Sequence, residues 1–170
     1  GIIALYAVFL LASWYGGTYA GLIAAGILAI ANYSLWISRT GYLDGFLVLW
    51  IPLSLFFFLK AEKEPRYYVW WGFAAGAGVL TKYTFLFMAP IFLGILLGRR
   101  RVILKEKMFI VGCIVLCTLL IPVVVYNALM WKTRGHPDAA LSTALGMRPA
   151  DFKGLDRIIN TSIFENIDVF

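Results

Sequence analysis

Residues 67–98 read YYVWWGFAAGAGVLTKYTFLFMAPIFLGILLG, an apolar run of 32 residues whose only polar cluster is Thr81-Lys82-Tyr83-Thr84. As one helix this run would be about 48 Å long, whereas the hydrocarbon core of a bilayer is about 30 Å thick. One helix would also place the basic flanks, Arg66 and Arg99-Arg100-Arg101, on opposite sides of a membrane, against the bias of Lys and Arg towards the cytoplasm. We therefore predict a tight hairpin that turns at 81–84 and places Lys82 on the external side.

The composition of the whole chain indicates a membrane environment. Hydrophobic residues make up 62% of the 170 and charged residues 14%, which is too little polar surface for a water-soluble domain. Further apolar runs cover about 2–13, 19–37, 43–59 and 108–131, and the last has the length of about 20 residues that crosses a bilayer. The predicted fold is all-α, a polytopic transmembrane helix bundle of about six membrane segments over 1–131, with an external polar tail or loop at 132–170.

The formal charge of +6 indicates topology and not a nucleic-acid partner. The basic residues gather in two short stretches between apolar runs, 60–66 and 99–107, which is the pattern of cytoplasmic loops. With both stretches in the cytoplasm, the connection that contains Arg39 is external, and so is Asp44 at the start of the next run. We expect a multi-pass protein of a bacterial or archaeal plasma membrane or of the endoplasmic reticulum, in contact with membrane lipids.

Three other features of the sequence have structural interpretations. The chain has no initiator Met and opens inside an apolar run, so we expect an internal segment of a longer protein. Cys113 and Cys117 lie four residues apart in an apolar run without the partners of a zinc site, and we interpret them as packing residues. His136, the only histidine, is interpreted as a structural or solvated loop residue. No metal and no cofactor is predicted.

Asp44 and Lys82 are the first candidates for a functional site, because a charge at membrane depth costs about 2.5–3.5 kcal/mol on insertion scales. Arg39 joins them through the predicted topology. Two cations and a carboxylate at one external mouth could hold a phosphate head group and accept a proton from a hydroxyl. The structural alternatives are a head-group anchor for Arg39, a snorkelling turn residue for Lys82, and a helix cap or salt-bridge partner for Asp44.

The glycines near Lys82 do not form a nucleotide-binding motif. The segment from Gly76 to Lys82 lacks the third glycine of a dinucleotide fingerprint and the glycine that precedes lysine in a P-loop. Gly72 and Gly76 instead match the small-xxx-small pattern of closely packed membrane helices. We predict that this pair brings the two arms of the 67–98 hairpin together.

Two of these segments also carry a family resemblance. Residues 38–47, SRTGYLDGFL, resemble the R-x-x-x-L-D-x-x-L segment of the protein mannosyltransferase and aminoarabinose transferase superfamily, which are glycosyltransferases of the GT-C fold. Residues 72–82, GFAAGAGVLTK, resemble the same family's G-x-x-x-G-L-A-x-L-T-K segment, and the helix containing Pro122 follows in the expected order. The resemblance covers about residues 1–135.

The resemblance implies a membrane enzyme that transfers a sugar, with inversion at the anomeric carbon, from a polyprenyl-phosphate donor to a lipid or protein acceptor on the external face. By the family pattern Asp44 is the catalytic candidate at the mouth of the active site, and Arg39 and Lys82 bind the donor phosphate. The acidic residue usually assigned as general base would lie upstream of Gly1, so this segment alone is expected to be inactive. The alternatives are a flippase or transporter of lipid-linked sugars and a structural membrane domain.

Overall fold

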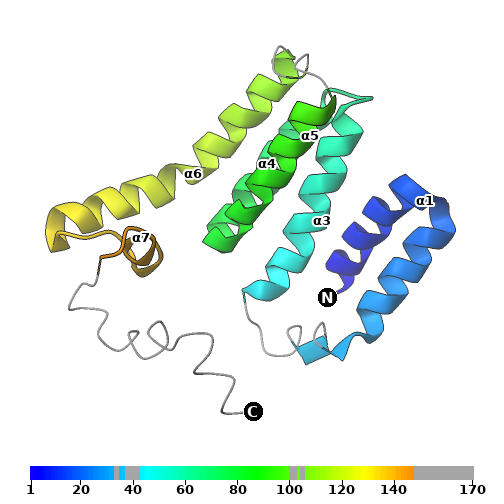
Figure 1. Ribbon diagram of the computed structural model, residues 1–170, viewed down its shortest axis with the longest axis horizontal. Helices are drawn as coiled ribbons and strands as arrows, with labels where there is room; N and C mark the ends of the chain where they lie inside the picture. Colours follow the sequence, from blue (N-terminus) through cyan, green and yellow to red (C-terminus); the bar gives the residue numbers. More distant parts are fainter. Residues whose placement is uncertain (33–34, 37–42, 100–102, 104–105, 148–170) are drawn as a thin grey trace. The chain divides into compact units, whose positions relative to one another are not determined.

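The computed structural model describes residues 1–32, 35–36, 43–99, 103 and 106–147, and in this part of the chain every regular element is helical (Figure 1). The all-α prediction is therefore confirmed. In chain order the helices are α1 (Ile2–Ile30), α3 (Asp44–Ala61), α4 (Tyr67–Thr81), the 3-10 helix η1 (Tyr83–Met88), α5 (Ala89–Arg99), α6 (Lys107–Arg134) and α7 (Ala139–Ala144).

The chain divides into two compact units, Gly1–Ile121 and Pro122–Phe170, and the boundary falls inside α6. Proline in a helix interior removes one backbone hydrogen bond and its ring presses on the preceding turn. Pro122 therefore marks a natural point of division in this helix. The predicted boundary between a membrane part and an external tail at 131 remains a prediction.

Helix α1 consists of two arms that fold back on each other at Gly17. Gly17 has φ 76° and ψ 179°, a backbone conformation open to glycine and strained for other residues. A Cβ at Gly21 would lie 2.8 Å from the backbone oxygen of Phe9, although these residues would be about 18 Å apart along a straight helix. The apolar run predicted at 2–13 and the first part of the run predicted at 19–37, up to Ile30, are therefore arms of one helical hairpin, as Figure 1 shows in two shades of blue.

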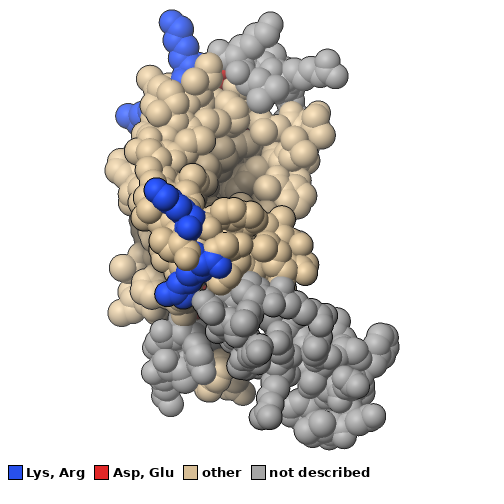
Figure 2. Space-filling view, turned by 90° about the vertical axis from the view of Figure 1, so that its left-hand side faces the viewer, with Lys and Arg blue, Asp and Glu red and all other residues tan. Residues whose placement is uncertain are grey.

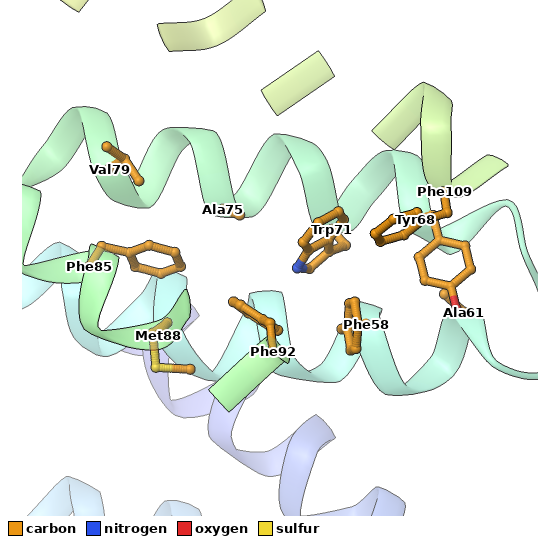
Figure 3. Packing of buried hydrophobic residues seen from close by; sticks show 10 residues of the cluster. All are labelled: Phe58, Ala61, Tyr68, Trp71, Ala75, Val79, Phe85, Met88, Phe92 and Phe109. Atoms are coloured by element: carbon orange, nitrogen blue, oxygen red, sulfur yellow. The ribbon is translucent and has the colours of Figure 1, made fainter. Parts of the chain in front are cut away.

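The core of the first unit is a cluster of aromatic rings contributed by α3, α4 and α5. Phe58 of α3, Trp71 of α4 and Phe92 of α5 contact one another, with ring centroids 5.2 Å apart for Phe58 and Trp71, 5.1 Å for Phe58 and Phe92, and 5.7 Å for Trp71 and Phe92. Figure 3 shows these rings facing one another between the helices. Edge-to-face and tilted ring pairs of this kind add to the stabilisation from burial. The triad thus fixes three helices against each other.

The predicted hairpin over 67–98 is confirmed. Helix α4 ends at Thr81, Lys82 is extended with φ −161° and ψ 132°, and the chain returns through η1 and α5. Phe85 packs against Gly78, and Phe92 packs against Trp71, so residues at equal distances from the turn face each other. The turn lies at Lys82, inside the predicted 81–84.

The prediction that Gly72 and Gly76 join the two arms of this hairpin is wrong. A Cβ at Gly72 would collide with the backbone oxygen of Gly112, and one at Gly76 would lie 2.8 Å from Cδ1 of Leu119, both in α6. Gly112 in turn lies against the backbone of Tyr68. The small residues therefore bring α4 and α6 together, whereas bulky aromatic side chains fill the space between α4 and α5.

Among the described residues, three helices, α1, α3 and α6, are long and apolar enough to cross a membrane by length and composition, with α1 counted over all 29 residues although it folds back at Gly17. In Figure 2 the Lys and Arg side chains form small groups on a surface that is otherwise largely uncharged. Large apolar side chains are exposed on the described helices, among them Phe87 of η1 at 78% and Leu97 of α5 at 71%. A surface of this kind is suited to lipid, and the protein is an integral membrane protein. The count of six membrane segments stays a prediction.

The second unit is held together by a polar corner between the end of α6 and α7. The backbone N–H of Asp138 donates to Oδ1 of Asn127 at 2.8 Å, and Nδ2 of Asn127 donates to Oδ2 of Asp138 at 3.1 Å. Asp138 also caps α7 by accepting from the backbone N–H of Leu141 at 2.9 Å. Helix α7 thus begins directly after its capping residue Asp138. His136 is buried, with Nδ1 2.8 Å from the Pro137 oxygen, so its role here is structural rather than solvated.

The contact between Gly72 and Gly112 makes a specific stability prediction. We expect Gly72→Ala to lower the free energy of unfolding by about 1–3 kcal/mol, because its methyl group meets backbone that cannot rotate away. Gly94→Ala is the matched control, since a Cβ there meets no atom within 4 Å and alanine gains about 0.5–1 kcal/mol of helix propensity. Thermal unfolding in detergent measures both. Equal stability of the two variants would contradict the close approach of α4 and α6.

The corner between Asn127 and Asp138 makes a second prediction. In Asn127→Ala the Asp138 amide loses its acceptor, so its hydrogen exchange should accelerate about tenfold, the factor that corresponds to ~1.4 kcal/mol. Thr143→Ala removes only a hydroxyl that donates to Ala139 within α7, and should leave exchange at Asp138 unchanged. Mass spectrometry of peptides spanning 135–147 reports the difference. Unaltered exchange in Asn127→Ala would show that the corner does not hold this segment.

Candidate functional site

Asp44 and Lys82, predicted to share one face, form an ion pair. Nζ of Lys82 donates to Oδ1 of Asp44 at 2.6 Å, across 38 residues of sequence. The pair exists because α3 begins at Asp44, α4 ends at Thr81, and the two helices pack antiparallel on the shared aromatic core. Both side chains are partly open, 38% exposed for Asp44 and 41% for Lys82. The site is thus an accessible charged pair at one end of two apolar helices.

The backbone of Lys82 is fixed on both sides. Its N–H donates to the Gly78 oxygen at 3.1 Å, which closes α4, and its own oxygen accepts from the N–H of Phe85 at 3.0 Å, which opens η1. Phe85 is buried and seats its ring against Gly78, where any larger residue would block it. The hydroxyl of Thr81 donates to the Ala77 oxygen at 2.8 Å. The turn therefore holds the Lys82 backbone in place and leaves its long side chain free to reach outward.

Asp44 is the first residue of α3, where a carboxylate interacts favourably with the positive end of the helix dipole. The structural alternative of a helix cap is wrong, because Leu43 occupies the cap position and no side chain makes a capping hydrogen bond. The alternative of a salt-bridge partner is observed. With only two rotatable bonds, the Asp44 side chain keeps its carboxylate close to the helix end.

The predicted trio is seen as a pair, because Arg39 lies outside the described residues. Among the side chains that the structure describes, Lys82 is the only cation paired with Asp44. The same part of the chain contains no group of three His, Cys, Asp or Glu side chains placed to hold a metal ion. What the described site offers chemically is one ammonium group and one carboxylate.

The surroundings of the pair are apolar and open. The same turns of chain that carry Asp44 and Lys82 expose large hydrophobic side chains: Leu43 at 57%, Phe46 at 53%, Leu80 at 43% and Leu86 at 53%. A charged group framed by exposed apolar surface matches an amphipathic ligand, which has a polar head and a hydrocarbon tail. Helices that face lipid also expose such residues to pack against lipid chains. The apolar surface therefore indicates a ligand site only in combination with the charged pair that it surrounds.

The charges at the opposite end of α3 and α4 are arranged differently. In the loop between these helices Arg66 pairs with Glu64 at 2.6 Å, and this hydrogen-bonded carboxylate raises the pKa of Arg66. Nζ of Lys60 lies 4.2 Å from the ring centroid of Tyr67, and Nζ of Lys63 lies 4.7 Å from that of Trp14. These cations rest on aromatic faces or pair with a near neighbour in sequence. The Asp44–Lys82 pair, by contrast, joins residues that are 38 positions apart in the sequence.

The sequence reasoning missed three buried polar groups. Ser54 of α3 is fully buried and donates to the Ile51 oxygen at 2.9 Å, and Asn127 anchors the corner of the second unit. The indole N–H of Trp71 is buried without a hydrogen-bond partner inside the aromatic core. A polar residue within an apolar helix was the available signal for Ser54 and Asn127. None of the three lies at the charged pair, and no chemistry follows from them.

One comparison with known proteins matches the part of the chain that contains this pair. The family model described as dolichyl-phosphate-mannose-protein mannosyltransferase matches residues 1–126, a range that includes both Asp44 and Lys82. Searches of curated proteins and of solved structures gave no match. The matched range covers most of the 170 residues. The chain therefore belongs to the dolichyl-phosphate-mannose-protein mannosyltransferase family.

Proposed function

We propose that the protein transfers a sugar from a polyprenyl-phosphate-linked donor to a lipid or protein acceptor at the external face of the membrane. Family membership gives the reaction class, a membrane glycosyltransferase of the mannosyltransferase type. The observation that carries the proposal for this chain is the Asp44–Lys82 pair, a cation and a carboxylate brought together from distant segments at one end of an apolar helical pair.

Lys82 is proposed to bind the phosphate of the donor, together with Arg39. An ammonium group forms short, charge-assisted hydrogen bonds to phosphate oxygens, and it stabilises the negative charge that grows on the phosphate as the sugar leaves. The exposed apolar side chains beside Lys82, such as Leu80 and Leu86, suit a polyprenyl chain lying along the same helices. Head and tail of the donor would thus meet matching surfaces.

Asp44 is proposed to act on the acceptor. In the transfer, the acceptor hydroxyl oxygen bonds to the anomeric carbon, the bond from that carbon to the phosphate oxygen breaks, and polyprenyl phosphate departs. The hydroxyl must also lose its proton, and a carboxylate that accepts a hydrogen bond from it lowers the barrier to that loss. Asp44 either takes this proton or orients the hydroxyl towards a base elsewhere in the protein. Its position next to Lys82 keeps donor and acceptor within one site.

The external location follows from the distribution of basic residues. Asp44 and Lys82 lie at the end of α3 and α4 that is remote from the loop containing Lys60, Lys63 and Arg66. Because α3 has 18 residues, the two ends are about 27 Å apart, close to the thickness of the hydrocarbon core. With the basic loop in the cytoplasm, the charged pair faces the external side.

Cysteine labelling tests this topology. In the full-length protein expressed in intact cells, Lys82→Cys should react with a membrane-impermeant maleimide, whereas Lys63→Cys should react only after the membrane is permeabilised. The native Cys113 and Cys117 are replaced by serine in both variants to remove background. Labelling of the Lys63→Cys variant in intact cells, with protection of Lys82→Cys, would reverse the proposed orientation and place the site in the cytoplasm.

Sugar transfer tests the proposed function. The full-length protein in proteoliposomes receives labelled undecaprenyl- or dolichyl-phosphate sugars and a mixed acceptor extract. Asp44→Asn and Lys82→Ala should each lower transfer by about 100-fold or more, the usual loss when one electrostatic group of an active site is removed, while the amount of protein in the membrane stays constant.

Glu64→Gln is the matched control for both variants, because it removes a carboxylate from an equally short ion pair at the other end of the helices. It should transfer sugar at the rate of the unmodified protein. Full activity of Asp44→Asn and Lys82→Ala would disprove the assignment of the site. Movement of the lipid-linked sugar across the bilayer without transfer to any acceptor would replace the proposed enzyme with a transporter.

A further inference from the structure

The charged pair poses a problem for a site that binds phosphate, because its cation is already occupied. Nζ of Lys82 lies 2.6 Å from Oδ1 of Asp44, the distance of a strong charge-assisted hydrogen bond. Together the two groups have no net charge. A phosphate that approaches this pair meets a neutralised lysine and, beside it, a carboxylate that repels it. Lys82 keeps two further N–H donors, but a phosphate bound to them would lie beside the Asp44 carboxylate, so donor binding favours a state in which Asp44 gives up its contact.

We infer that Asp44 is an exchangeable counter-ion, which Lys82 releases when it takes up the phosphate of the lipid donor. The inference rests on the proposed function and adds a coupling between the two substrates. Before the donor binds, the Asp44 carboxylate is engaged by Lys82 and is a poor hydrogen-bond acceptor for a hydroxyl. After the donor binds, the carboxylate is released and can receive the acceptor. Binding of the donor thereby prepares the site for the acceptor, which favours an ordered reaction.

The geometry of the pair makes this exchange feasible through a side-chain movement alone. The backbone of Lys82 is held by hydrogen bonds to Gly78 and Phe85 and does not have to shift. Its four-carbon stem rotates freely, and the ammonium group can reach a phosphate while Asp44 stays in the first turn of α3. The pair is open enough for a ligand to approach, with 41% of the Lys82 side chain and 38% of the Asp44 side chain exposed.

The strength of the pair is also suited to exchange. Ion pairs as exposed as this one change an equilibrium constant by about fivefold at most, so a ligand can displace the carboxylate without a large loss of affinity. A deeply buried pair would resist displacement, because the carboxylate left behind would have no water to solvate it. The phosphate of the donor is a diester, with two free oxygens and one negative charge, and it competes with the carboxylate on equal charge. The polyprenyl monophosphate that departs is a monoester with three oxygens and a charge of about −1.5 to −2, and it competes more strongly.

Binding of undecaprenyl monophosphate, with no sugar attached, tests the exchange separately from catalysis. The full-length protein in lipid nanodiscs is titrated with this lipid, and the dissociation constant is compared between variants. Asp44→Asn should bind it about threefold to fivefold more tightly, because the competing carboxylate is gone. Lys82→Gln should bind it at least about tenfold more weakly. In the Lys82→Gln background, Asp44→Asn should bring a clearly smaller gain, since only the direct repulsion between carboxylate and phosphate is then removed.

Two controls keep the result interpretable. Glu64→Gln should bind the lipid with the affinity of the unmodified protein, which excludes a general effect of removing one negative charge. If Asp44→Asn does not accumulate in membranes, Asp44→Ser replaces it, because serine is also uncharged and tolerated at the start of a helix. Thermal unfolding of every variant confirms that folded protein is compared with folded protein.

The outcomes separate this inference from the proposed function. Tighter binding by Asp44→Asn combined with lost sugar transfer supports both. Unchanged or weaker binding by a folded Asp44→Asn, in a protein whose unmodified form binds the lipid through Lys82, overturns the exchange and leaves the proposed function standing. If the unmodified protein does not bind the lipid phosphate, or if Lys82→Gln binds it equally well, the assignment of Lys82 to the donor site is disproved. The proposed exchange is then disproved as well.

Discussion

The contact among Phe58, Trp71 and Phe92 sets the register on which the first unit depends. Each ring comes from a different helix, and each touches the other two. A small shift of α3 along α4 would separate the rings and leave a cavity, at a cost of several kcal/mol for residues of this size. In the observed register the start of α3 lies beside the end of α4. The aromatic core, some distance from the charged pair, therefore determines that Asp44 and Lys82 meet.

The sequence was sufficient to predict the features that follow from length, charge and solvent. The 67–98 run is too long for one crossing and has basic residues at both ends, so its reversal at Lys82 was predictable, and so was the convergence of Asp44 and Lys82. The free-energy cost of placing a charged side chain at membrane depth then singled out these two residues. These arguments need no knowledge of which helix packs on which.

Which helices and side chains contact each other could not be predicted from the sequence in the same way. The pattern of Gly72 and Gly76 shows that another helix approaches closely, but it does not say which one, and α6 proved to be the partner instead of α5. The sizes of the side chains decided the matter, since Phe92 holds α5 at a distance from α4, whereas Gly112 of α6 lets the backbone of α4 approach closely. Likewise, nothing local to Asn127 indicated that it would bond to Asp138, 11 residues later.

The distance in sequence between Asp44 and Lys82 also matters while the protein is being made. Asp44 leaves the ribosome 38 residues before its partner, and at 5–20 residues per second this interval lasts about 2–8 s. During that time the Asp44 carboxylate in the first turn of α3 has yet to meet Lys82, and the positive end of the helix dipole compensates part of its charge. The pairing is completed when the α4 hairpin follows. The ion pair that forms the site is thus also the contact that gives the Asp44 carboxylate its counter-ion during synthesis.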